Sequence, residues 1–240
     1  MGLSNLMTIG EIVAETPAAA RVFERLGIDY VCGGKHPIGE ICERKGVGLE
    51  ELSAEIELAA RMEIPTEARD WNTAPLAEVI RHILVTHHLY LENALPAMER
   101  LVTRIADLDG DQFPELVPPL KRIFQHMKQD LTAHLREEET VQFPAIIQME
   151  KTGGSTGAMP DGPLARLEHD HDEAGRALEE MRGITNNFTP PPGANRNLRT
   201  LYRELKVFES DMVRHLHIEN NILFARANRL AVSLNEAIHP

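Results

Sequence analysis

The segment Met212-Val-Arg-His-Leu-His-Ile-Glu-Asn-Asn-Ile222 sets a histidine and a glutamate into the apolar stripe of an amphipathic helix. Residues three or four positions apart share one helical face, and this face reads Leu201, Leu205, Phe208, Met212, His215, Glu219 and Ile222. His215 and Glu219 therefore stand where an ordinary helix core would carry leucines. Side chains at such i and i+4 positions lie one above the other, so both are expected to point inward together.

Three further segments repeat this pattern. One has the same His-x-x-x-Glu spacing, and its stripe reads Leu120, Phe124, Met127, Leu131, His134, Glu138, Val141 and Ala145. Two others each carry one histidine, in the stripes Leu76, Ile80, Leu84, His88, Leu91, Leu95, Met98 and Leu164, Leu167, His171, Ala174, Leu178, Met181. The sequence thus predicts four long helices that each direct at least one metal-ligand type toward a common core.

The two glutamates need a counter-charge, because an uncompensated buried carboxylate costs several kcal/mol or takes up a proton. None of the four stripes contains Lys or Arg, so a bound cation is the favoured partner of Glu138 and Glu219. Four imidazoles with two carboxylates suit iron, manganese or zinc and exclude a thiolate site. A single zinc would leave ligands over, so the set favours two metal ions that share carboxylates, and iron over zinc.

The other histidines are less informative. A lone buried histidine is more often a hydrogen-bonded core residue than a ligand, and only the repeated register of the six residues overrides that reading. Periodicity leaves His87 open as an alternative to its neighbour His88, and it places His169 on a mixed, solvated face. Three more could hydrogen-bond metal-bound imidazoles or lie at the surface: His82, His126 and His217.

The breaks in periodicity predict an all-α chain with an antiparallel four-helix bundle behind a small helical domain. Residues 1–62 form the small domain, with helices from about Thr8, after Thr16-Pro17, from Pro37 and over Leu49–Met62; residues 63–74 form a linker, and residues 75–240 form the bundle. Gly- and Pro-rich interruptions at 151–163 and 186–193 separate bundle helices.

Charge and composition limit the classes of molecule that the protein can bind. The formal charge of −12 argues against nucleic acid or an anionic membrane. The sequence shows neither a long apolar span nor a signal peptide, so we expect a cytoplasmic protein. Its two cysteines, Cys32 and Cys42, make no disulfide framework and fit no zinc knuckle.

Several motifs together carry a resemblance to a known family. They are Asp29-Tyr-Val-Cys-Gly-Gly-Lys35, Asp70-Trp71 ahead of Ala74-Pro-Leu-Ala-Glu78, His171-Asp-Glu-Ala-Gly175, Thr185-Asn-Asn187 with Thr189-Pro-Pro-Pro192, and Glu219-Asn-Asn221. Over nearly its whole length the chain resembles the RIC family, the di-iron proteins for repair of iron centres, which place a hemerythrin-like bundle behind a small Cys-Gly-Gly domain.

The resemblance implies a ligand set and a function. The family's histidine ligands fall on His88, His134, His171 and His215, and its bridging carboxylates on Glu138 and Glu219, which favours His88 over His87. It implies two non-haem iron ions that are bridged by carboxylates and by an oxo group. It also implies a stress-response protein, which restores iron–sulfur clusters after damage by nitric oxide or oxidants and does so by supplying iron. The partners are damaged or apo iron–sulfur proteins, with nitric oxide or dioxygen as small ligands; a homodimer stays open.

One position departs from the family pattern. Two cysteines usually precede the Gly-Gly pair, but here the first is Val31, which puts any role of paired thiols in doubt. Cys32 stays a candidate catalytic residue, since Lys35 and the helix begun by Pro37 could lower the pKa of its thiol. The alternative is a small residue that packs a turn.

Two other functions stay in view. Reduction of nitric oxide to nitrous oxide at the metal pair is an enzymatic alternative, also attributed to the family. A hemerythrin-like oxygen carrier or sensor is the lesser one, because hemerythrins use more histidine and would not need the Cys-Gly-Gly domain.

Overall fold

The computed structural model describes residues 3–30, 33–62, 70–153 and 161–238, excluding the side chains of residues 24, 61–62, 161–168 and 233–238. Across these ranges the chain is helical and contains no β-strand, only one isolated antiparallel bridge between Thr8 and Pro37. The predicted all-α class is confirmed. The chain divides into two compact units, Met1–Pro75 with Leu216–Asn228 and Leu76–His215 with Arg229–Pro240.

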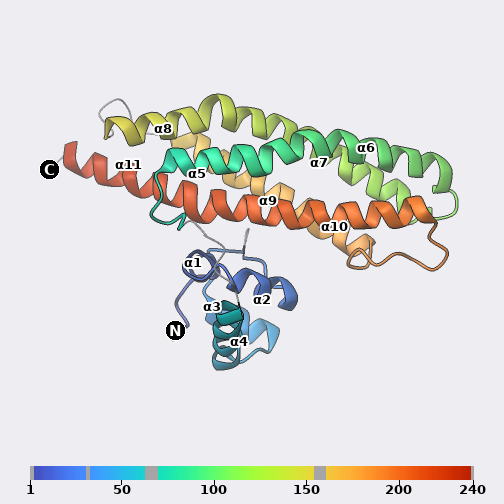
Figure 1. Cartoon of the computed structure of the whole chain (residues 1–240), viewed down its shortest axis with the longest axis horizontal. Helices are drawn as coiled ribbons and strands as arrows, with labels where there is room; N and C mark the ends of the chain where they lie inside the picture. The colour runs from blue at the N-terminus through green and yellow to red at the C-terminus, as the bar shows by residue number, and fades with distance from the viewer. Residues whose placement is uncertain (1–2, 31–32, 63–69, 154–160, 239–240) are drawn as a thin grey trace. The chain divides into compact units, whose positions relative to one another are not determined.

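The bundle consists of four long helical rods (Figure 1). Three of them are interrupted by a short π-helical stretch, labelled η. In chain order the rods are α5 (Leu76–Ile83), η1 (Leu84–His88) and α6 (Leu89–Asp109); α7 (Val117–Glu137), η2 (Glu138–Gln142) and α8 (Phe143–Thr152); α9 (Asp161–Ile184); and α10 (Arg196–His217), η3 (Ile218–Phe224) and α11 (Ala225–Ile238). The first two rods are antiparallel, because α6 packs on α7 and α5 packs on α8.

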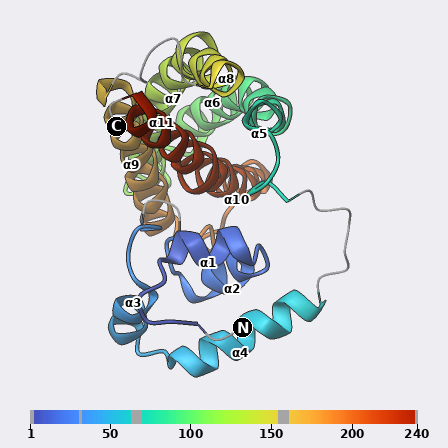
Figure 2. The ribbon, with the colours of Figure 1, turned by 90° about the vertical axis from the view of Figure 1, so that its left-hand side faces the viewer.

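Apolar stripes fill the space between the rods, as the sequence predicts. Leu91, Ile105, Leu120 and Leu205 are almost fully buried, and Phe124 and Phe208 meet edge to face with ring centroids 6.1 Å apart. Burial of each such side chain stabilises the fold by about 1.5–3 kcal/mol. Figure 2, viewed along the rods, shows them packed side by side.

The N-terminal helices are α1 (Ile9–Glu15), α2 (Ala19–Leu26), α3 (Ile38–Lys45) and α4 (Leu49–Met62). Thr8 begins α1 with a capping box to Glu11, and Gly27 follows α2 with a positive φ of 62°. The four predicted helices are confirmed, but α2 starts at Ala19 rather than Pro17. The amides of Ala19 and Ala20 bond back to the carbonyls of Thr16 and Pro17, so a turn precedes the helix.

The predicted linker lies partly outside the described residues, which omit 63–69. Its described end is tied down within the first unit: the Asn72 amide donates to the Ala14 carbonyl at 2.6 Å, and Arg226 donates to the Trp71 carbonyl at 2.6 Å. The domain boundaries read from the sequence stay predictions. Leu216–Asn228 belongs to the same unit as the N-terminal helices, although it continues the fourth rod.

The two predicted breaks lie on either side of α9. Residues 154–160 of the first lie outside the described part. In the second, Asn186, Asn187 and Phe188 take positive φ angles of 47°, 56° and 53° in succession, a conformation that cannot continue a right-handed helix. None of the helices in the described ranges has both the length and the apolar character that a bilayer crossing requires.

A carboxylate caps the first rod. Glu150 of α8 accepts the amides of Leu76 and Ala77 at 2.7 and 3.0 Å, two donors that lack partners within α5. We expect Glu150→Ala to lower the free energy of unfolding by about 1–2 kcal/mol, because both amides lose their acceptor. Urea unfolding of the metal-free protein measures this, with exposed Glu180→Ala as the control. Equal stability of the two variants would contradict the cap.

Candidate metal centre

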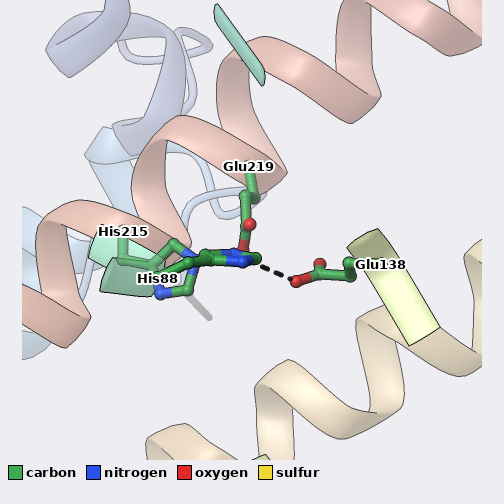
Figure 3. A group of neighbouring side chains, drawn as sticks. All are labelled: His88, Glu138, His215 and Glu219. Atoms are coloured by element: carbon green, nitrogen blue, oxygen red, sulfur yellow. Dashed lines mark ion pairs between the residues drawn. The ribbon is translucent and has the colours of Figure 1, made fainter. Parts of the chain in front are cut away.

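The six residues that the sequence selected come together in the interior of the bundle. They form two groups of four whose donor atoms lie within 4.8 Å of one another: His88, Glu138, His215 and Glu219, and His134, Glu138, His171 and Glu219. Figure 3 shows the first group, with His215 and Glu219 one helical turn apart on the fourth rod. Glu138 and Glu219 belong to both groups, so the arrangement is two adjacent sites with shared carboxylates.

Glu138 is the centre of the measured contacts. Its Oε1 lies 3.2 Å from His134 Nε2 and 3.8 Å from His171 Nε2, and its Oε2 lies 3.5 Å from His88 Nε2. The Nε2 atoms of His134 and His171 are themselves 2.8 Å apart. Imidazole nitrogens and carboxylate oxygens therefore converge in a space the size of a metal coordination sphere.

Burial makes this convergence costly without a cation. Glu138, Glu219 and His215 have no exposed surface, and His171 is 1% exposed. The groups contain neither Lys nor Arg, and Glu138 pairs with the imidazoles of His88, His134 and His171. Buried carboxylates in such a setting are stabilised by a bound cation. The donor set therefore fits the metal pair expected from the sequence, although the role of each residue as a ligand stays a prediction.

Acidic side chains hold the opposite nitrogen of two of the imidazoles. Glu139 Oε1 lies 2.8 Å from His88 Nδ1, and Asp170 Oδ2 lies 3.3 Å from His134 Nδ1. A carboxylate at Nδ1 fixes the proton there and leaves the Nε2 lone pair facing the centre, which is the tautomer a metal requires. Helical periodicity does not identify Glu139 and Asp170 as site residues. In the sequence they are marked only by their positions next to Glu138 and His171, and both lie outside the inward-facing stripes.

His87 is a supporting residue rather than a member of either group. It is 3% exposed, its Nδ1 lies 3.0 Å from Asp211 Oδ1, and its ring stacks on His215 with an interplanar angle of 11°. This contact restricts the rotation of the His215 ring. The structure thus places His88, not His87, among the converging donors, in agreement with the family resemblance.

The remaining histidines lie elsewhere. His169 and His126 are solvent-exposed beside Glu173 and Asp130, and the partly buried His82 contacts Thr86 and the ring of His87. His217 is buried against Tyr30, and desolvation lowers its pKa to about 4. The candidate residue Cys32 lies outside the described residues. Cys42 is a buried free cysteine, and burial raises the pKa of its thiol.

Each π-helical stretch contains a residue of the two groups. His88 ends η1, Glu138 begins η2, and Glu219 lies in η3. A π-turn adds one residue to a helix and shifts the inward face, a feature frequent at functional sites. The sequence stripe is therefore wrong after Glu138: Val141 is 54% exposed and Ala145 is half-buried, whereas Gln142, Phe143 and Ile146 are buried.

Comparison with known proteins agrees with this geometry. Residues 79–227 match the family described as Hemerythrin HHE cation binding domain, and residues 5–60 match a Domain of Unknown function (DUF542). The chain is 36% identical over 219 residues to the iron-sulfur cluster repair protein YtfE of Citrobacter koseri and to that of Escherichia coli O157:H7, covering 91% of this chain and 95% of each relative. It is 35% identical over 225 residues to the YtfE of Pectobacterium atrosepticum, covering 92% and 96%.

The π-turns give a test of the site that spares the core. Deleting the exposed Val141 should convert η2 to a regular helix that keeps Glu138, Phe143 and Ile146 all facing inward, so that metal binding and the helical circular-dichroism signal both stay. Deleting the exposed Gln129 from α7 should rotate all later residues by about 100° and unfold the bundle. Equal damage from both deletions would contradict this assignment.

Proposed function

The chain belongs to the hemerythrin HHE cation binding family, and from that membership we propose that it repairs damaged iron–sulfur clusters by supplying iron from a pair of buried sites. One observation carries the proposal: two four-residue groups of buried imidazoles and carboxylates share Glu138 and Glu219. This pair of sites occurs in a chain that is 36% identical, over nine-tenths of its length, to proteins named for iron–sulfur cluster repair.

The donor set suits iron that has to be given away. Imidazole and carboxylate are harder ligands than the thiolates of an iron–sulfur cluster, and neither group contains cysteine. Iron held in this way is bound less tightly than iron in a cluster, so its transfer to an apo-cluster protein is favoured in free energy. Iron is thus both the resident ion and the cargo.

The six residues of the two groups would have different roles in binding two ions. Glu138 and Glu219, common to both groups, would bridge the pair, and the four histidines would each complete one side, with His88 and His215 on one ion and His134 and His171 on the other. Glu139 and Asp170 orient two of the imidazoles. Bound iron would supply open positions for nitric oxide or dioxygen, the small ligands expected under stress. The client proteins would be damaged or apo iron–sulfur proteins of the cytoplasm.

Reduction of nitric oxide is the second candidate. Two nitric oxide molecules, two electrons and two protons give nitrous oxide and water, and the shared carboxylates favour it because they hold the two sites side by side. A ferrous pair would supply the electrons for one turnover only, so repeated turnover needs an external electron donor and is separable from iron supply by omitting reductant. An oxygen carrier is disfavoured, because the four histidines divide evenly between the two groups, whereas hemerythrins use more histidine.

Metal content tests the ligand assignment. Protein purified without oxygen and without added metal should contain about two iron ions per chain by elemental analysis. His134→Leu and Glu138→Leu should each lose iron while the helical signal persists, because leucine suits a buried helix position. Exposed His126→Leu is the matched control and should keep its iron. A full complement in both stripe variants, or one tightly held zinc in the wild type, would overturn the assignment.

Iron transfer tests the function itself. Iron-loaded protein, incubated anaerobically with an apo iron–sulfur protein and sulfide, should restore the visible absorbance of the cluster, whereas Glu138→Leu protein should not. Nitrous oxide formation on addition of nitric oxide and reductant, with no iron transfer, would instead favour the enzymatic alternative.

A further inference from the structure

Asn221 ties the N-terminal segment to the helical turn that carries Glu219. Its Nδ2 donates to the carbonyl of Tyr30 at 3.2 Å and to Nδ1 of His217 at 2.9 Å, so both amide hydrogens are used. A backbone carbonyl only accepts, which fixes the orientation of the amide. All of these residues belong to the first compact unit, and Asn221 lies in η3 two residues after Glu219.

The N-terminal segment is shaped to receive this amide. A Cβ atom on Gly10 would lie 2.8 Å from Asn221 Cγ, a distance that real Cβ atoms do not show, so only glycine fits there without a shift. The Gly10 amide donates to the Gly34 carbonyl at 2.8 Å, which holds Gly34 beside α1. Tyr30 is 2% exposed, and its ring meets the edge of His217 with centroids 5.5 Å apart.

We infer that Asn221 is a positioning residue that couples docking of the N-terminal segment to retention of the metal by Glu219. The inference rests on the proposed function, because it assumes that the bundle holds a metal ion that it can release. The physical link is short: Glu219 and Asn221 share one π-helical stretch, whose irregular hydrogen bonding lets it rearrange more readily than an α-helix.

The consequence concerns the rate of release. While Asn221 bonds to the Tyr30 carbonyl, η3 is held against the N-terminal segment, and the bond to His217, one turn back on the same rod, orients the Asn221 side chain. When Tyr30 leaves, Asn221 loses this bond and His217 loses its ring contact, so the turn can carry Glu219 away from the ion. The small N-terminal domain thereby acquires a role in delivery that is independent of any thiol.

Release kinetics of the full-length protein test this coupling. Asn221→Ala and the isosteric Asn221→Asp both remove the amide donors, so each should load the full amount of iron but release it to a chelator about tenfold faster, the change expected when hydrogen bonds of ordinary strength are lost. Asn228→Ala, at an exposed position of α11 in the same unit, should release at the wild-type rate. Hydrogen exchange at the Gly10 amide should accelerate in the Asn221 variants even without metal.

A double-mutant cycle separates coupling from simple loss of packing. Gly10→Ala should accelerate release as Asn221→Ala does, because the new methyl group displaces the amide. In the Asn221→Ala background the same Gly10→Ala change should add much less, since the clashing amide is gone. Gly183→Ala, which meets no atom within 4 Å, is the matched control and should change nothing.

The outcomes separate the two proposals. If the wild type holds no iron, the proposed function fails, and release of loaded Co²⁺ together with Gly10 exchange still decides the coupling. If the wild type holds iron and the Asn221 variants release it at the wild-type rate, the coupling fails and the proposed function stands. Additive effects of Gly10→Ala and Asn221→Ala would also overturn it. Should Asn221→Ala fold poorly, Asn221→Asp and Gly10→Ala carry the same test.

Discussion

Two glutamates without any exposed surface impose the condition that the rest of the bundle meets. Glu138 and Glu219 can stay ionised in the interior only where positive charge is supplied, and the four imidazoles around them are neutral ligand types rather than permanent cations. Because Glu138 and Glu219 come from different rods, and the histidines from all four, the charge requirement fixes the register of every rod against the others. The apolar stripes supply most of the stability, but the carboxylates decide where the stripes must be interrupted.

Helix periodicity in the sequence was sufficient to identify this core and the six converging residues. It was sufficient because His134 with Glu138 and His215 with Glu219 obey the same i, i+4 rule as the leucines around them. It failed beyond Glu138, where Val141 faces outward and Phe143 faces inward. A π-turn inserts one residue there, and the local amino-acid composition does not predict that insertion. Residues that lie beside the stripe, such as Glu139, could not be identified because periodicity predicts only which residues face inward.

The fourth rod belongs to both compact units, so residues of one helix serve two parts of the chain. His215 lies in the unit of the bundle, whereas Glu219, one turn along, lies in the unit of the N-terminal helices. The contacts of Tyr30 with Asn221 and of Trp71 with Arg226 therefore act on a helix that also holds a carboxylate of the site. Periodicity could not predict this link either: the Glu219-Asn-Asn221 motif contributes to the family resemblance, but it does not indicate that Asn221 contacts Tyr30.

The carboxylates on the outer nitrogens of His88 and His134 have a consequence for oxidation state. Glu139 and Asp170 draw the Nδ1 protons and make both imidazoles stronger electron donors, and one of these imidazoles belongs to each four-residue group. Stronger donation favours a trivalent over a divalent ion, so it would lower the reduction potential of a redox-active ion at either position. Such an ion would then resist reduction more than one held by imidazoles without these acceptors.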